Sequence, residues 1–246
     1  MIHELLLLII DKLSNRDKVT FLHTDKTNNS YKDKLYFNDQ VNCNNIQKSP
    51  YFDKFTNVVL TDQTNLPKNI KKITIDSYQY ITPDALPKMI IPMTVTHLNF
   101  NTRNIAEKNF IYNLVPLTHL CINFNSIPPM QNTITHLYIK FWVADAYQMP
   151  NSVTHLYINY CQCSNIEQYI VPSVKHLCIS DSYISKNTIP SHITKVTINE
   201  FCVLPSGIGK RCNIDIGSYI PATVKILCLP FTYNKTLPTH CKIIKQ

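Results

Sequence analysis

The chain has 246 residues, of which 44% are hydrophobic and only 3 are glycine, and its formal net charge is +8. This length allows one large domain or two small ones, and the scarcity of glycine argues against a phosphate-cradling loop. The lysines are scattered, which argues against a nucleic-acid binder, and the nine cysteines lack the C-x-x-C pairs of a zinc or disulfide framework, so we expect reduced thiols in a cytoplasmic protein.

The N-terminal residues 1–37 are expected to be helical. One apolar stripe has helical spacing, and its members are Ile2, Leu5, Leu6, Ile9, Ile10 and Leu13. Ser14 followed by Asp17 is typical of a capping box that begins a second helix. A weaker third helix is expected over 31–37. The apolar run 5–10 is too short to span a bilayer and has no basic segment before it, so we expect neither secretion nor membrane insertion.

Residues 38–54 are polar and are expected to form a linker and entry turn. From residue 55 one template recurs, apolar-x-x-apolar-x-apolar, often with a proline three residues before it. The copies are Phe55-Val58-Leu60, Ile70-Ile73-Ile75, Val95-Leu98-Phe100, Leu117-Leu120-Ile122, Ile134-Leu137-Ile139, Val153-Leu156-Ile158, Val174-Leu177-Ile179, Ile193-Val196-Ile198 and Val224-Leu227-Leu229. A degenerate copy ends at Cys212-Ile214, and a last copy is Cys241-Ile244.

Each copy, here called a rung, predicts one short strand, because its second and third apolar positions are two residues apart. A strand this short cannot bury its apolar face alone, so consecutive strands must stack into a solenoid. The rest of each rung is too short for a full helix and two loops, and we expect extended or 3-10 backbone there. The predicted fold class is therefore α+β: short N-terminal helices, then a leucine-rich-repeat-like solenoid with one parallel β-sheet of short strands.

A histidine precedes the central leucine in five rungs: His97, His119, His136, His155 and His176. If the apolar residues point inward, these imidazoles point onto the opposite, concave sheet face. That face is the predicted target-binding site, formed by His97, Asn99, His119, His136, Tyr138, His155, Tyr157, Asn159 and His176. A straight ladder of imidazoles does not converge on a metal ion, so we expect no metal and no cofactor.

Cys121 and Cys178 each lie two residues after a histidine, on the same face of the strand. This spacing could suggest a thiol–imidazole pair, but a repeat produces such pairs automatically and no orienting third group is evident. The sequence also lacks paired carboxylates and a nucleophile elbow. We therefore do not expect an enzyme, and a recognition surface is the preferred meaning of the polar face.

The phrase "IPMTVTHLNF", residues 91–100, and its neighbours resemble the FNIP repeat, a leucine-rich-repeat relative common in social amoebae and in giant viruses of amoebae. The segment "NFNSIP", residues 123–128, carries the element that names that family. The resemblance covers about residues 55 to 246 and is closest over 91–198. It implies a protein-binding solenoid, located in the host cytoplasm if the chain is viral.

Residues 4–17, "ELLLLIIDKLSNRD", resemble the core of an F-box. The chain departs from that family at Ile2, where a proline is usual, and at Lys26, which is not followed by the usual tryptophan. F-box followed by FNIP repeats is a known arrangement. The resemblance implies that a Skp-type adaptor of a cullin ubiquitin ligase binds this segment through Leu5, Leu7, Leu8, Ile9 and Leu13.

The preferred interpretation is a non-enzymatic adaptor with three parts: an F-box-like segment (1–37), a linker (38–54) and a solenoid (55–246) that binds an unknown target protein. The first alternative is a stand-alone protein-binding solenoid whose N-terminal helices only cap the stack. The second alternative is a nucleic-acid binder driven by the charge, which predicts affinity that falls steeply with salt. Co-purification with a Skp-type adaptor separates the first two.

Overall fold

The structure is a computed structural model. It describes residues 2–24, 26–60, 65–76, 91–101, 116–122, 130–142, 149–161, 166–180, 189–199, 216–231, 233–234 and 236–245. The chain divides into two compact units, Met1–Thr102 (unit 1) and Arg103–Gln246 (unit 2). Each unit is described by itself.

Unit 1 begins with three helices, α1 (Ile2–Asp11), α2 (Asn15–Thr24) and α3 (Lys26–Asn29). The N-cap is confirmed: the Asp17 backbone N–H donates to Ser14 Oγ at 3.2 Å. The Asp17 carboxylate accepts from the Ser14 hydroxyl at 2.7 Å, in place of the Ser14 backbone N–H that a capping box uses. The helix predicted over 31–37 is wrong, because the third helix ends at Asn29 and Phe37 instead forms a parallel bridge with Phe55.

Helix α1 buries only part of the apolar stripe that its spacing defines. Ile10 is buried, whereas Leu5 and Ile9, both in the predicted stripe, are 59% and 55% exposed, and Leu8 is 66% exposed. The buried face is set by contacts that are distant in sequence. The amide of Asn38 donates to the Asp11 carboxylate at 3.2 Å, and the backbone N–H of Asn15 donates to Asp39. These bonds position the helices against the chain segment that follows them.

Residues 38–54, predicted to be a linker and entry turn, contain regular structure. Strand β1 (Val41–Asn42) pairs with the first predicted rung, with Val41 opposite Val58. Helix α4 (Cys43–Ile46) follows at once and is capped by Asn42, whose side chain accepts from the Asn44 N–H. A 3-10 helix, Phe52–Lys54, leads into the next strand. The repeat stack therefore begins one strand earlier than predicted.

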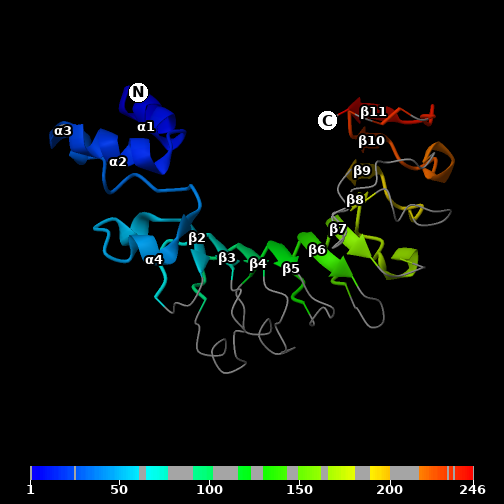
Figure 1. Ribbon diagram of the computed structural model, residues 1–246, viewed down its shortest axis with the longest axis horizontal. Coiled ribbons are helices and arrows are strands. Elements are labelled where there is room, and N and C mark those ends of the chain that lie inside the picture. The colour runs from blue at the N-terminus through cyan, green and yellow to red at the C-terminus, as the bar shows by residue number, and fades with distance from the viewer. Residues whose placement is uncertain are drawn as a thin grey trace. The chain divides into compact units, whose positions relative to one another are not determined.

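The structure describes eleven strands, which follow one another in the order of the chain, and the pairs within each unit are parallel. The parallel sheet and few short helices confirm the predicted fold class, and Figure 1 shows the succession of strands within each unit. After β1, unit 1 holds β2 (Asn57–Leu60), β3 (Lys72–Ile75) and β4 (His97–Phe100). Unit 2 holds β5 (His119–Ile122), β6 (His136–Trp142), β7 (His155–Cys161), β8 (His176–Ser180), β9 (Lys195–Asn199), β10 (Ile226–Leu229) and β11 (Lys242–Lys245).

The predicted apolar positions form the core of each unit. The registers place equivalent positions opposite each other, for example Ile73 opposite Leu98 and Leu137 opposite Leu156. All four of these side chains are at most 1% exposed. Side chains alternate across a strand, so this inward stacking turns the intervening residues to the opposite face. We call that opposite face the outer face.

The proline three residues before many rungs has a structural role. The backbone N–H of the first apolar residue donates to the proline carbonyl, as in Val95 to Pro92 at 3.0 Å and Val153 to Pro150 at 3.1 Å. This is the hydrogen bond of a β-turn, and it directs the chain into the strand. The backbone N–H groups of the two residues that follow both donate to one carbonyl of the preceding rung. In the Val153 rung, for example, the N–H groups of Thr154 and His155 both donate to the Thr135 carbonyl.

The C-terminal rungs differ from the prediction in register. Ile243 lies opposite Leu227, so Ile244, which the template aligned inward, lies on the outer face and is 38% exposed. A shift of one residue moves a whole strand's apolar set to the other face. The degenerate copy at Cys212-Ile214 lies outside the described residues, and β9 pairs directly with β10.

The backbone between strands of unit 2 includes 3-10 helices at Ile166–Tyr169 and Gly217–Tyr219, which agrees with the expected return path. Over the residues whose structure is described, no helix has the length and apolar character needed to cross a membrane.

Candidate functional site on the outer face of unit 2

The histidines of unit 2 form one column along the outer face. His119, His136, His155 and His176 occupy the first residue of four successive strands and lie opposite one another in register. The rings of His119 and His136 stack with centroids 4.1 Å apart at 11°, and those of His136 and His155 stack with the same values. The column ends with an edge contact between His155 and His176 at 5.3 Å. Strand spacing alone brings the rings together, and their stacking fixes their orientation.

A threonine precedes three of these four histidines, His119, His136 and His155, and fixes the imidazole further. Thr135 Oγ1 lies 3.0 Å from His136 Nδ1, and Thr154 Oγ1 lies 2.9 Å from His155 Nδ1. The Thr135 hydroxyl also donates to the Thr118 carbonyl at 3.2 Å. A hydroxyl has one proton, so the Nδ1–H of neutral His136 then donates to the threonine, and Nε2 keeps its lone pair. The same bonds recur at Thr154 and His155, so His136 and His155 present acceptor nitrogens on the outer face, whereas His176 Nε2 lies 2.9 Å from Thr197 Oγ1.

A second column, here called the tyrosine column, lies two residues further along the same strands. Cys121, Tyr138, Tyr157 and Cys178 are opposite one another in register. The rings of Tyr138 and Tyr157 stack with centroids 3.9 Å apart at 4°. Tyr138 is 37% exposed, whereas Cys178 is buried. The column is therefore most accessible at Tyr138 on β6, whose ring is stacked on that of Tyr157.

The environment of these columns favours neutral side chains. Desolvation by burial lowers the pKa of His136, and burial together with His136 and Lys195 lowers that of His155. Burial, and next in size the positive charges of Lys195, His155 and His136 nearby, lower the pKa of His176 to about 4. Burial and the neighbouring Tyr138 raise the pKa of Tyr157 above its ordinary value. At neutral pH the face offers uncharged aromatic rings with hydrogen-bonding edges.

The geometry gives this face little scope for catalysis or metal binding. Stacked parallel imidazoles direct their lone pairs in parallel, whereas zinc needs convergent tetrahedral ligands. Among the described residues there is no group of three or more His, Cys, Asp or Glu side chains that could hold a metal ion. Burial raises the pKa of the Cys121 thiol, so this cysteine is not poised as a thiolate near His119.

The nine residues predicted to form the target-binding face do not all belong to one unit. His97 and Asn99 are on β4 of unit 1, where His97 Nδ1 lies 2.8 Å from Thr96 Oγ1 and both side chains are half-buried. The other predicted residues, His119, His136, Tyr138, His155, Tyr157, Asn159 and His176, are on β5–β8 of unit 2. Asn159 is exposed. Unit 2 therefore brings together most of the predicted face.

The residues predicted to bind an adaptor lie on and just after α1. Leu5, Leu8 and Ile9 are more than half exposed, and their spacing places them together on one side of the helix. Leu7 and Leu13 are half-buried. Three of the five residues therefore form an accessible apolar face, and their binding to an adaptor stays a prediction. We call Leu5, Leu8 and Ile9 the α1 apolar face.

Sequence reasoning missed Lys18 and the surroundings of Tyr36. Lys18 is 1% exposed, and its Nζ donates to the Tyr36 carbonyl at 2.9 Å and lies 3.7 Å from the Asp11 carboxylate. Nothing in the local pattern distinguishes this lysine from an exposed one, because its partners are distant in the chain. Tyr36 and Asp11 also line a pocket of about 470 Å³ within unit 1.

A comparison with curated proteins finds similarity to a repeat protein. The chain is similar to an FNIP repeat-containing protein of Acanthamoeba polyphaga mimivirus. The two are 27% identical over 258 residues, covering 95% of this chain and 54% of the relative, so the chain spans about half the length of the curated relative it matches. No protein-family model matches the chain. Among solved structures, CroV588, described as a circular leucine-rich-repeat protein, is 19% identical, with a TM-score of 0.44 over 78% of this chain and 37% of that one.

Proposed function

We propose that this chain is a protein-interaction adaptor whose outer face binds a target protein and whose α1 apolar face binds a Skp-type adaptor of a cullin ubiquitin ligase. The observation that carries target binding is the pair of columns on β5–β8, in which stacked rings are held in place before any partner arrives. Ordered aromatic side chains lose little conformational entropy on binding, and tyrosine combines contact area with a hydrogen-bonding hydroxyl.

The adaptor proposal is supported by the α1 apolar face. Large apolar side chains that are more than half exposed together mark interaction surfaces more often than isolated ones do. Leu5, Leu8 and Ile9 meet this description, whereas Ile10 on the same helix is buried in unit 1. Burial of each such side chain in a partner contributes about 1.5–3 kcal/mol before the costs of association. The similarity of residues 4–17 to an F-box suggests the class of partner.

A binding experiment with a purified Skp-type adaptor tests this part. We expect Leu8→Asp to weaken adaptor binding at least tenfold, because a carboxylate would have to be desolvated in the interface. Met93→Asp is the matched control, since Met93 is a 76% exposed apolar residue elsewhere in unit 1. Circular dichroism would show that both variants remain folded. Equal binding by Leu8→Asp and the unsubstituted chain would refute the F-box proposal.

Affinity purification from an amoebal host, with mass spectrometry, tests the target face. We expect the double variant Tyr138→Asp/Tyr157→Asp to lose the target protein while it keeps the Skp-type adaptor. A double variant at two exposed positions of other rungs, Lys225→Asp/Lys242→Asp, serves as the control. Capture of the same target by the tyrosine variant would mean that the target binds elsewhere.

The alternative function, a solenoid whose helices only form a cap, also has support. Ile10, Lys18 and Leu22 are buried, and Lys18 and Asn15 bond to the 36–39 segment, as a cap on the first strands requires. A cap needs only its inward face, so this alternative does not explain the α1 apolar face. It predicts that the target co-purifies while adaptor and cullin do not.

A further inference from the structure

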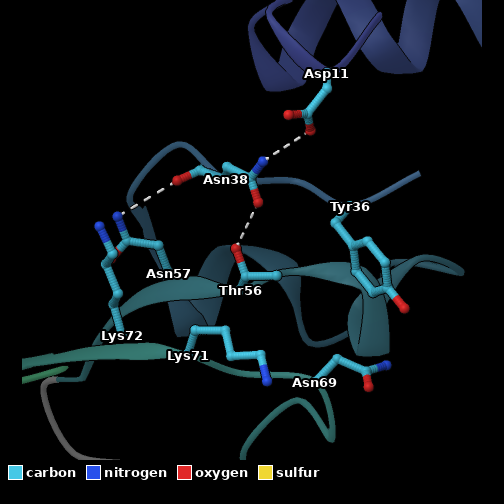
Figure 2. Close-up of a pocket in the computed structure, with 8 residues that line it drawn as sticks. All are labelled: Asp11, Tyr36, Asn38, Thr56, Asn57, Asn69, Lys71 and Lys72. Atoms are coloured by element: carbon cyan, nitrogen blue, oxygen red, sulfur yellow. Dashed lines mark hydrogen bonds between the residues drawn. The ribbon is translucent and has the colours of Figure 1, made fainter. Parts of the chain in front are cut away.

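The pocket of unit 1 is built around Asn38, which connects α1 to the start of β2. Its side-chain amide donates to the Asp11 carboxylate of α1 at 3.2 Å, and its Oδ1 accepts from Thr56 Oγ1 at 2.8 Å. Its backbone carbonyl accepts from Asn57 Nδ2 at 3.4 Å. Figure 2 shows these three bonds along one side of the pocket. Because both elements hold Asn38, this wall is formed without any ligand.

The negative charge in the pocket already has partners. Asp11 accepts from Asn38 and lies 3.7 Å from the ammonium of Lys18, which is itself buried. The neutral lining residue Asn69 also has a partner, because its Nδ2 donates to the backbone carbonyl of Asp53 at 2.9 Å. These groups are therefore occupied by contacts within unit 1, and they leave no unneutralised carboxylate among the residues that line the pocket.

The positive charge in the pocket is not balanced in the same way. Lys71 and Lys72 line it, both are exposed, and neither forms an ion pair with any residue that the structure describes. In Figure 2 their side chains extend in different directions, Lys72 beside Asn57 and Lys71 toward Asn69. The hydroxyl of Tyr36 lies on the same side of the pocket as Asn69. The groups left to meet a ligand are thus two separated ammonium groups and a phenol.

We propose that this pocket binds an acidic segment of a protein partner, with successive carboxylates reaching Lys71 and Lys72. Two ammonium groups that extend apart match charges spread along a chain better than one compact anion. The volume of about 470 Å³ lies within the usual range for pockets that take side chains or small ligands. Charge complementarity of this kind raises the association rate and selects partners. The site is distinct from the α1 apolar face and does not depend on adaptor binding.

Fluorescence anisotropy with a labelled oligoglutamate peptide tests the proposal, and an oligoglutamine peptide of the same length is the uncharged comparison. We expect the glutamate peptide to bind and the glutamine peptide not to bind. The double variant Lys71→Glu/Lys72→Glu should weaken binding at least tenfold. The affinity for the unsubstituted chain should fall as salt increases.

The repeat provides a matched control. Lys225 and Lys242 are exposed and lie on consecutive rungs of unit 2, where Lys225 occupies the repeat position of Lys71 and Lys242 that of Lys72. As in Lys71 and Lys72, the backbone N–H of each donates to a carbonyl of the preceding rung. Lys225→Glu/Lys242→Glu changes the net charge equally and should leave peptide binding unchanged. Equal loss in both double variants would overturn the proposal, since it would show general charge attraction. So would binding of the glutamine peptide, or displacement of the glutamate peptide by octathymidylate or inorganic phosphate at equal charge concentration.

The adaptor experiment separates this inference from the proposed function. Lys71→Glu/Lys72→Glu should still bind the Skp-type adaptor, while Leu8→Asp should still bind the glutamate peptide. Retained peptide binding by Lys71→Glu/Lys72→Glu would overturn the pocket proposal whatever the adaptor result.

Discussion

The two units build different outer faces on the same strand pattern. In unit 1 the first residues of β2, β3 and β4 are Asn57, Lys72 and His97, a sequence of polar and charged side chains. In unit 2 the same position carries imidazoles on β5–β8, the first three of which stack at 4.1 Å. The inward positions are alike in both units, so the buried column sets the fold and the outer positions are free to specialise. One repeat can thus present a charged surface in one region and an aromatic surface in another.

The largest expected effect concerns the positions that the two units share. Ile73→Ala in unit 1 and Leu137→Ala in unit 2 should each lower the free energy of unfolding by about 3 kcal/mol, because each leaves a cavity in a buried column. Lys72→Ala and His136→Ala, on the outer face, should each cost less than about 1 kcal/mol. Urea denaturation measures all four. Similar losses from inner and outer substitutions would contradict the common inward column.

A smaller loss in the free energy of unfolding is expected at acidic pH, and it should come from unit 2. The pKa of His176 is lowered to about 4, so the folded chain holds this ring neutral while the unfolded chain takes up a proton near pH 6.5. Stability present above pH 6.5 is therefore lost progressively as pH falls toward 4. The groups around the ring are His136 on β6, His155 and Tyr157 on β7, and Lys195 and Thr197 on β9.

We expect a loss of about 1–2 kcal/mol from His176 over this pH range, below the full linkage value because water reaches the ring. His176→Gln should flatten the pH dependence of the unfolding free energy, whereas Asn132→Gln, at an exposed position of unit 2 that carries no titratable group, should not. Unfolding curves measured at several pH values would show the difference. An equal slope in both variants would mean that the stacked column does not exclude protons.

The smallest effect is the coupling between paired outer residues. A double-mutant cycle on Tyr138 and Tyr157, each replaced by alanine, should give a coupling energy of about 0.5–1 kcal/mol, because the rings stack at 3.9 Å. The same cycle on Val59 and Thr74, which face each other at the equivalent positions of unit 1, should give a smaller value. Equal coupling in both pairs would show that the stack contributes no more than ordinary neighbours do.

The sequence by itself determined the repeating features. The spacing of the apolar residues, with prolines three residues ahead, predicted the inward side chains of β2–β10, because strand alternation is local and a repeat leaves the same choice at every copy. It also predicted that His136, Tyr138 and their equivalents share the outer face. The misaligned last copy shows the limit of this reasoning: Cys241 and Ile244 match the template loosely, and only pairing with β10 decided that Ile243 lies opposite Leu227.

Only the tertiary structure decided features that depend on distant contacts. The helical spacing of α1 was visible, but the face it buries depends on where residues 36–39 pack, so Leu5 and Ile9 are exposed and Ile10 is buried. The burial of Lys18 and the pocket also depend on distant contacts, because the pocket walls come from α1, the 36–38 segment and two strands. Local sequence sets periodicity through backbone geometry, whereas the choice of face and partner is made by contacts between residues that the chain brings together only when it folds.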